Sequence, residues 1–124
     1  MTSRARILTA AIFALSVLAY LARADDAKVR IVIESSLTQF EPAFVRLRIR
    51  VEPDPANRAL ILALISDGFE TSSLEQLAGS SAPITRWWQV KGVPAGEYQI
   101  VAEVYRPSAK NWRAQQALTV LGVP

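Results

Sequence analysis

Apolar residues recur at every second position in several blocks of this 124-residue chain. The period of two is clearest over 44–52, where valine, leucine and isoleucine alternate with arginines, and it returns over 28–34, 84–91 and 98–104. This pattern is typical of β-strands that bury one face. The run Leu60–Ile65 is continuously apolar, as in a strand covered on both faces, and Leu118 and Val120 end the series.

Turn-forming residues separate these blocks. Pro53-Asp54-Pro55, Ser66-Asp67-Gly68 and the segment 107–111 interrupt the alternation, and residues 69–83 are predicted to be a polar connection. Strands at this spacing, without long helical patterns between them, favour an antiparallel sandwich. We therefore expect an all-β antiparallel sandwich of about seven strands over residues 25–124.

The first 24 residues have the three parts of a secretory signal peptide. Arg4 and Arg6 precede the apolar run 7–22, and Ala22-Arg23-Ala24 places small residues before a cleavage site. The alternative is an uncleaved anchor helix, although this run is shorter than the roughly 20 residues that span a bilayer. Under both readings residues 25–124 are exported, periplasmic or extracellular, and contact a membrane only through an uncleaved N-terminal segment.

The charge balance changes once this segment is removed. The chain carries 14 basic and 11 acidic side chains, but Arg4, Arg6 and Arg23 lie in the segment that leaves. The remainder is neutral, so the sequence pI of about 9.7 gives no reason to expect a nucleic-acid partner. Because the chain has no cysteine, an exported domain must rely on its core rather than on disulfides. That is commoner in bacterial exports than in small animal secreted domains.

The missing residue types exclude much chemistry. Without histidine or cysteine the chain cannot form Ser-His-Asp or Cys-His catalytic groups, histidine-ligated zinc sites, thiol redox sites or ordinary haem ligation. Glu97 and Glu103, on one predicted strand, lie about 20 Å apart, too far for a glycosidase pair. We therefore expect a protein that is not an enzyme, with no catalytic residue, cofactor or metal.

Oxygen ligands for calcium are the remaining metal alternative. Glu52, Asp54 and Asn57 share one predicted loop, and Asp67 and Glu70 share another. Aspartate and asparagine are also favoured in turns for backbone reasons, and this turn role is the one we expect here.

The segment Val93-Pro94-Ala95-Gly96-Glu97-Tyr98-Gln99-Ile100 resembles the tyrosine corner of immunoglobulin-like sandwiches. Together with Ala82-Pro83-Ile84 and Trp88, it resembles the region of strands E and F in bacterial immunoglobulin-like domains. Ile100 stands where antibody domains have their second cysteine. The resemblance implies that Tyr98 bonds back to the backbone beside Gly96, and that the domain serves adhesion, spacing or partner binding.

The resemblance also implies which strands share a sheet. Residues 28–34, 44–52 and 84–91 then correspond to strands A, B and E. Their outward residues form a basic face: Lys28, Arg30, Arg46, Arg48, Arg50, Lys91 and Trp87. The outward file of strand F contains Glu97, Gln99, Val101, Glu103 and Tyr105. The basic face is either a solvated strand surface or a docking surface for a protein or an anionic cell-surface polymer.

These patterns predict an exported, non-catalytic immunoglobulin-like binding or structural module of the cell envelope. One alternative is an accessory subunit that joins a larger envelope assembly by strand addition, since an open sandwich has free sheet edges. The other is a carbohydrate-binding module, because flat aromatic side chains stack on sugars. Trp87 is the one tryptophan of three that is predicted to face outward.

Overall fold

Strand β3 (Ala43–Val51) shows how the alternating sequence becomes structure. Its apolar residues are buried, except for Phe44, and its three arginines face outward, so one side of the strand belongs to the core. The computed structural model describes residues 27–123, and the predicted signal or anchor segment lies outside the described residues. Within that range, no helix has the length and apolarity that a membrane crossing requires.

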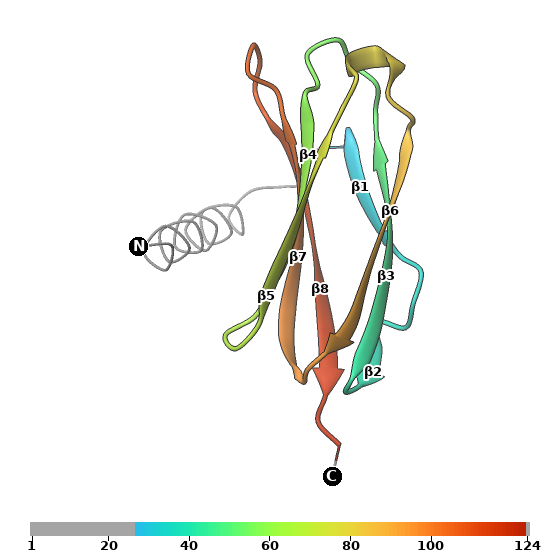
Figure 1. Cartoon of the computed structure of the whole chain (residues 1–124), viewed down its shortest axis with the longest axis vertical. Coiled ribbons are helices and arrows are strands. Elements are labelled where there is room, and N and C mark those ends of the chain that lie inside the picture. Colours follow the sequence, from blue (N-terminus) through green and yellow to red (C-terminus); the bar gives the residue numbers. More distant parts are fainter. Residues whose placement is uncertain (1–26, 124) are drawn as a thin grey trace.

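The described residues form a sandwich of two β-sheets (Figure 1). Besides β3, the strands are Val29–Ile33 (β1), Thr38–Phe40 (β2), Ala59–Ile65 (β4), Glu70–Gln76 (β5), Thr85–Val93 (β6), Gly96–Tyr105 (β7) and Trp112–Leu121 (β8). A short 3₁₀ helix, Gly79–Ser81, precedes β6. One sheet has the order β1-β3-β6, and the other has the order β2-β8-β7-β4-β5. Neighbouring strands are antiparallel except for β2 and β8. The prediction of an all-β antiparallel sandwich is confirmed.

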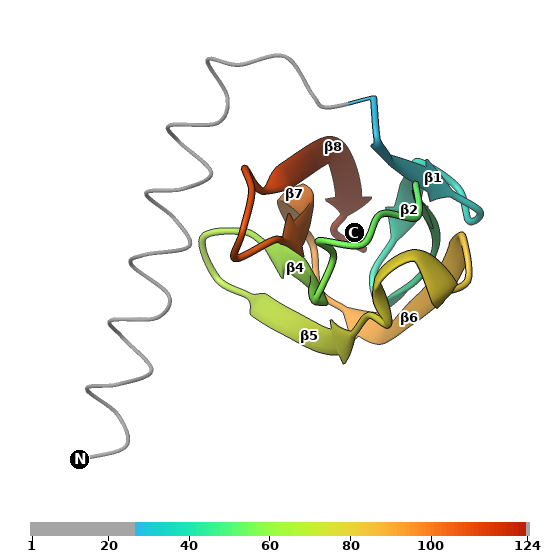
Figure 2. The same cartoon turned by 90° about the horizontal axis from the view of Figure 1, so that it is seen from above.

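The core lies between the two sheets, which Figure 2 shows from above. Leu47 and Ile49 of β3, Leu60 and Leu64 of β4, and Ile100 of β7 are fully buried in one cluster. β4 also buries Ala63 on its other side, against Val101 of β7. Burial on both faces explains why the sequence of β4 is apolar throughout.

The turn between β6 and β7 has the geometry of a tyrosine corner. Tyr98 is 2% exposed, and its hydroxyl donates a hydrogen bond of 2.7 Å to the carbonyl oxygen of Pro94. A Cβ atom added to Gly96 would lie only 3.3 Å from Cε2 of the Tyr98 ring. A residue without a side chain therefore lets the tyrosine ring pack against the turn.

Two strands depart from the sequence prediction. β5 lies in the segment 69–83, which the sequence predicts to be a polar connection, and β2 is a further strand beyond the predicted series. β5 pairs with β4 alone, and its residues alternate between exposed and half-buried. Backbone pairing to a neighbouring strand, rather than burial of an apolar file, places such an edge strand in the sheet, so its sequence carries a weak signal.

Candidate anion-binding face

The outer surface of the sheet β1-β3-β6 carries most of the residues predicted to form a basic face. Arg46, Arg48 and Arg50 alternate along β3 with residues that are fully buried, so all three side chains point away from the core. The strand rise places successive members of this file about 7 Å apart. Arg46 and Arg50 are exposed, and Arg48 is half-buried.

Trp87 of β6 lies beside two of these arginines. It is the cross-strand partner of Arg48 and is 52% exposed. The guanidinium carbon of Arg46 lies 5.0 Å from the centroid of the indole ring, and that of Arg48 lies 6.0 Å from it. Both distances fit a cation–π contact, so one exposed ring helps to orient two guanidinium groups.

Two cations of this surface have acidic partners. Lys28 Nζ lies 3.2 Å from a carboxylate oxygen of Glu52, and Arg48 Nε lies 3.2 Å from a carboxylate oxygen of Glu34. These pairs are partly exposed to solvent, where ion pairs contribute little to stability.

The other cations have no acidic partner among residues 27–123: Arg30, Arg46, Arg50 and Lys91. Arg30 of β1 lies directly opposite Arg50 of β3. Lys91 is exposed at the far end of β6, where the register with β3 shifts, and so lies apart from the others. Arg30, Arg46, Arg48, Arg50 and Trp87 therefore form the connected part of the surface, here called the arginine face.

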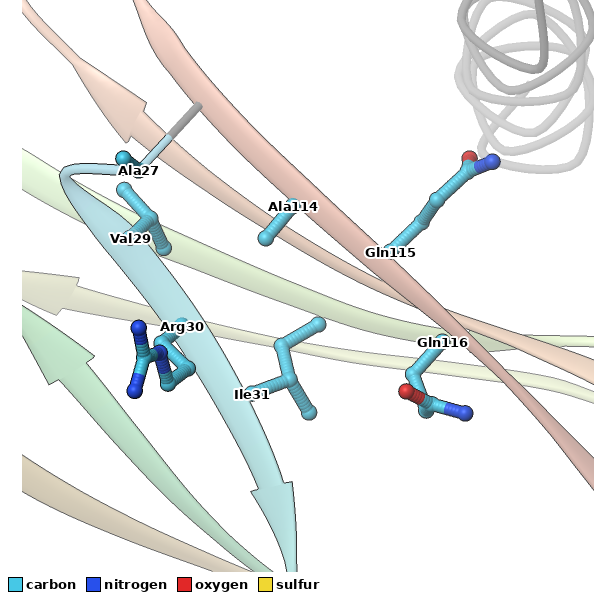
Figure 3. Close-up of a pocket in the computed structure, with 7 residues that line it drawn as sticks. All are labelled: Ala27, Val29, Arg30, Ile31, Ala114, Gln115 and Gln116. Atoms are coloured by element: carbon cyan, nitrogen blue, oxygen red, sulfur yellow. The ribbon is translucent and has the colours of Figure 1, made fainter. Parts of the chain in front are cut away.

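A cleft of about 290 Å³ separates β1 from β8 next to this face. Figure 3 shows Arg30 projecting from β1 away from β8, while Ile31 turns towards β8. Apart from Arg30, Gln115 and Gln116, the lining residues of the cleft are alanine, valine and isoleucine. The cleft has no carboxylate or hydroxyl group in its lining, so we place the candidate site on the arginine face.

The predicted outward file of strand F lies on β7, in the five-stranded sheet, and is only partly exposed. Glu103 lies 2.7 Å from Nε of Arg113, and both side chains are largely buried. Glu97 accepts a hydrogen bond of 2.9 Å from the hydroxyl of Thr119, and Val101 in the same file is buried. These carboxylates are already engaged within the sheet.

Sequence reasoning missed another arginine, Arg106, which follows β7. Its Nη2 lies 3.0 Å from Oδ1 of Asp54, and its Nε donates a hydrogen bond of 3.1 Å to Oδ1 of Asn57. Its guanidinium carbon lies 4.0 Å from the centroid of the Trp112 ring. We call Arg106 and these three partners the Arg106 cluster. No sequence signal marks it, because 52 residues separate Arg106 from Asp54.

Asp54 and Asn57, from one of the two loops of the calcium alternative, belong to the Arg106 cluster. Oδ1 of Asp54 accepts a hydrogen bond of 2.9 Å from the backbone N–H of Ala56, as expected of a turn. This bond and the bond from Arg106 lower the pKa of Asp54. Within residues 27–123 no group of three or more His, Cys, Asp or Glu side chains lies together.

No protein-family model matches the sequence, and no curated protein matches it. Solved structures do share the fold. A superoxide reductase (neelaredoxin) from Ignicoccus hospitalis is 16% identical, with a TM-score of 0.59 over 77% of this chain and 83% of that one. The sulfur carrier protein SoxY from Chlorobium limicola is 13% identical, with a TM-score of 0.60 over 90% and 98% of the two chains. A superoxide reductase variant from Archaeoglobus fulgidus is 16% identical, with a TM-score of 0.53 over 78% and 96%.

These comparisons contradict two predictions from the sequence. We expected a non-catalytic envelope module, with a strand-addition subunit and a carbohydrate-binding module as alternatives, and we expected that the protein is not an enzyme. Structures with this fold include several superoxide reductases, so the fold is one that redox enzymes use. The envelope module was inferred from an immunoglobulin-like pattern, which identifies a sandwich but not what the sandwich does. The exclusion of an enzyme was inferred from the missing histidine and cysteine. At these identities the likeness concerns the fold.

A redox metal is the group that such a fold suggests, and the residues present do not fit one. Imidazole and thiolate groups are the usual protein ligands of iron and copper, and this sequence has neither histidine nor cysteine. The carboxylates in the described part of the chain are dispersed, and several are bound to arginine or lysine. We therefore derive no reaction step through a metal.

Proposed function

We propose that this protein takes part in oxidation–reduction chemistry and that its arginine face binds an acidic protein with which it acts. The redox role is supported by the fold, which superoxide reductases and a sulfur carrier protein share. The binding role is supported by one observation: three arginines and a tryptophan face outward together, and two of the arginines, Arg46 and Arg50, form no ion pair within residues 27–123.

The dimensions of the arginine face favour a protein surface over a small molecule. The file from Arg46 to Arg50 extends over about 14 Å of one strand, which is longer than a single small anion. Arginine and tryptophan are also the residue types that contribute most to protein–protein binding energy. An acidic surface would complement the whole file and would speed the encounter.

The binding proposal is tested with poly-L-glutamate as the acidic probe and the full chain as the receptor. We expect the double variant Arg46→Gln/Arg48→Gln to raise the dissociation constant by about tenfold at low salt, since two charge–charge contacts are lost. The matched control, Arg46→Lys/Arg48→Lys, keeps the charge and should bind nearly as tightly as the unaltered chain. Binding should weaken as salt rises towards 0.5 M. Equal affinity of the glutamine variant and the unaltered chain would refute the proposed face.

The redox role is tested in cells. A strain that lacks the protein should be more sensitive to a redox-cycling compound that generates superoxide. The unaltered gene should restore resistance, and the Arg46→Gln/Arg48→Gln gene should not. Unchanged sensitivity of the deletion strain would remove the redox role while leaving the measured binding in place.

We also propose that the chain is exported with cleavage after Ala24. The support is the basic start, the apolar run 7–22 and the small residues that follow it. Mass spectrometry of fractionated cells should find a mature N-terminus at Asp25 outside the cytoplasm. Intact Met1 in membranes would indicate an anchor instead, and recovery from the cytosol would refute export.

We infer, finally, a relationship to bacterial immunoglobulin-like domains. It is supported by the bond from Tyr98 to Pro94, the close approach at Gly96 and the shared sheet of β1, β3 and β6. Tyr98→Phe removes only the hydroxyl and should lower the free energy of unfolding by about 1–2 kcal/mol. An unchanged value in urea unfolding would count against a structural corner at this position.

A further inference from the structure

The outward residues of β1 and β3 meet in cross-strand pairs, and one pair is unlike its neighbours. At one end, Lys28 and Glu52 form an ion pair of 3.2 Å. At the next outward pair, Arg30 lies directly opposite Arg50, so two positive charges face each other. Like charges in such a position destabilise a sheet. The fold therefore keeps an unfavourable pair where a neutral residue would be better for stability.

No acid in the described part of the chain forms an ion pair with Arg30 or Arg50. The ion pairs found there engage other cations: Lys28, Arg48, Arg86, Arg106 and Arg113. On the other side of Arg50, the cross-strand neighbour is the neutral Thr85 of β6. Both arginines are exposed, so an ion from solution can reach them.

The two arginines also share a groove of about 290 Å³. Its lining includes Lys28, Arg30 and Arg50, with Pro53 and Ile84 at the same site. Glu52 is the acid of this lining, and it is bonded to Lys28. The groove therefore combines a concave surface with two positive charges that nothing in it neutralises.

We propose that Arg30 and Arg50 together bind one tetrahedral oxyanion, a phosphate or sulfate group, in this groove. The Cβ atoms of residues directly opposite in an antiparallel pair lie about 4.5–5.5 Å apart, so two guanidinium groups reach a single ion. Each guanidinium can present two parallel N–H donors to an oxyanion. A carboxylate has two oxygens and is satisfied by one arginine, whereas a tetrahedral oxyanion has enough oxygens for both.

This inference goes beyond the proposed function, because it concerns a small oxyanion group and centres on Arg30 and Arg50, the two members of the arginine face that the poly-L-glutamate test leaves unaltered. Arg46, Arg48 and Trp87 are not required for it. The group can be a free ion or the terminal group of a larger molecule. Inorganic phosphate and phenyl phosphate separate these sources, since the ester occupies one oxygen of the phosphate.

The test follows the Nε–H signals of the arginine side chains in NMR spectra of the full chain. Inorganic phosphate is added at constant ionic strength, with chloride as the balancing ion. We expect saturable shifts of the signals of Arg30 and Arg50, and much smaller shifts with acetate. Arg50→Gln should abolish the saturable shift of Arg30, and Arg30→Gln should abolish that of Arg50. Lys110→Gln, an equal loss of charge on an exposed loop, should change neither.

The melting temperature gives a second readout. In chloride buffer, Arg30→Gln and Arg50→Gln should each melt about 1–4 °C higher than the unaltered chain, because the repulsion is removed. Added phosphate should raise the melting temperature of the unaltered chain but not of these two variants.

Two outcomes would overturn the proposal: phosphate-induced NMR shifts spread evenly over all exposed arginines, or the same phosphate response in both glutamine variants as in the unaltered chain. Phenyl phosphate that binds as well as inorganic phosphate would identify an attached group as the source, and weaker binding would identify the free ion.

The two proposals fail separately. Loss of poly-L-glutamate binding in Arg46→Gln/Arg48→Gln with normal phosphate shifts at Arg30 would support both. Normal poly-L-glutamate binding in that variant, together with the expected phosphate shifts, would remove the acidic-protein partner and leave the oxyanion site standing.

Discussion

The Arg106 cluster and the arginine face use the same side chain in opposite ways. The Arg106 side chain is 11% exposed, and it contacts a carboxylate, an amide oxygen, a backbone carbonyl and an aromatic ring. Arg50 is exposed, has no acidic partner in the described residues and faces another arginine across the sheet. The donors of Arg106 are occupied within the fold, whereas those of Arg50 remain available.

This difference distinguishes an arginine whose charge is used within the fold from an arginine whose charge is available to a partner outside the molecule. A buried arginine must find partners, because leaving it unpaired away from water is costly. An exposed arginine is under no such constraint, so its partner can come from outside the molecule. A local arrangement that lowers stability without an evident structural benefit is more typical of a functional site than of a scaffold. On this reasoning the arginine face, and not the Arg106 cluster, is the candidate site.

Substitution of the structural arginine, Arg106, should have the largest effect on the free energy of unfolding. Arg106→Gln leaves the amide oxygen of Asn57, a residue 1% exposed, without its donor and removes the partner of Asp54. We expect the free energy of unfolding to fall by about 2–3 kcal/mol, the cost of leaving buried polar groups unsatisfied. Urea unfolding followed by tryptophan fluorescence measures it.

Lys110→Gln is the matched control for this loss of charge. Lys110 lies on the same loop, but it contacts Arg106 through its backbone carbonyl and not through its side chain. Its substitution should change the free energy of unfolding by less than about 0.5 kcal/mol. If both variants were equally stable, the Arg106 cluster would not have the structural role assigned to it.

The sequence was sufficient to predict the parts of the fold that an apolar file defines. The alternating pattern predicts β3 and β6 as strands, because burial of one strand face gives the sequence a period of two. Their place in one sheet agrees with what the immunoglobulin-like resemblance implies. β5 is hard to predict from the sequence, since it is an edge strand whose side chains are exposed or half-buried. The Arg106 cluster has no sequence signal, because its members come together only when the sheets pack.

Part of the candidate site could also be predicted. The outward direction of Arg46, Arg48 and Arg50 follows from strand geometry alone. The direct opposition of Arg30 and Arg50 depends on the register between β1 and β3, which a single sequence does not specify. The prediction of function was wrong for a different reason. The role as a module came from a fold-level resemblance and the exclusion of an enzyme from missing residue types, whereas sandwiches of this kind include redox enzymes.

A second test uses pH to distinguish charge within the Arg106 cluster from hydrogen bonding there. The pKa of Asp54 is lowered in the folded state, chiefly by the N–H of Ala56 and next by Arg106. A lowered folded pKa stabilises the protein above the unfolded pKa of about 3.9, and this contribution is lost as pH falls through the folded pKa. Asp54→Asn keeps an oxygen acceptor but loses the charge. The variant should be less stable than the unaltered chain at pH 7, and the difference should shrink between about pH 5 and pH 2. A difference that is constant across this range would show that the charge of Asp54 is not what stabilises the cluster.

The smallest expected effect completes the comparison, because the arginine face should be nearly neutral for stability. Arg46 has no acidic partner among residues 27–123, and its cation–π contact with Trp87 lies at the exposed surface. Such a contact contributes about 0.5–1 kcal/mol, and relief of repulsion from the neighbouring arginines offsets part of it. We expect Arg46→Gln to change the free energy of unfolding by less than about 0.5 kcal/mol at low salt. In 0.5 M salt, where exposed charges are screened within a few ångströms, the offset should disappear and the variant should become slightly less stable than the unaltered chain. A loss as large as that of Arg106→Gln would mean that Arg46 is a structural arginine after all, and the distinction between the two regions would fail.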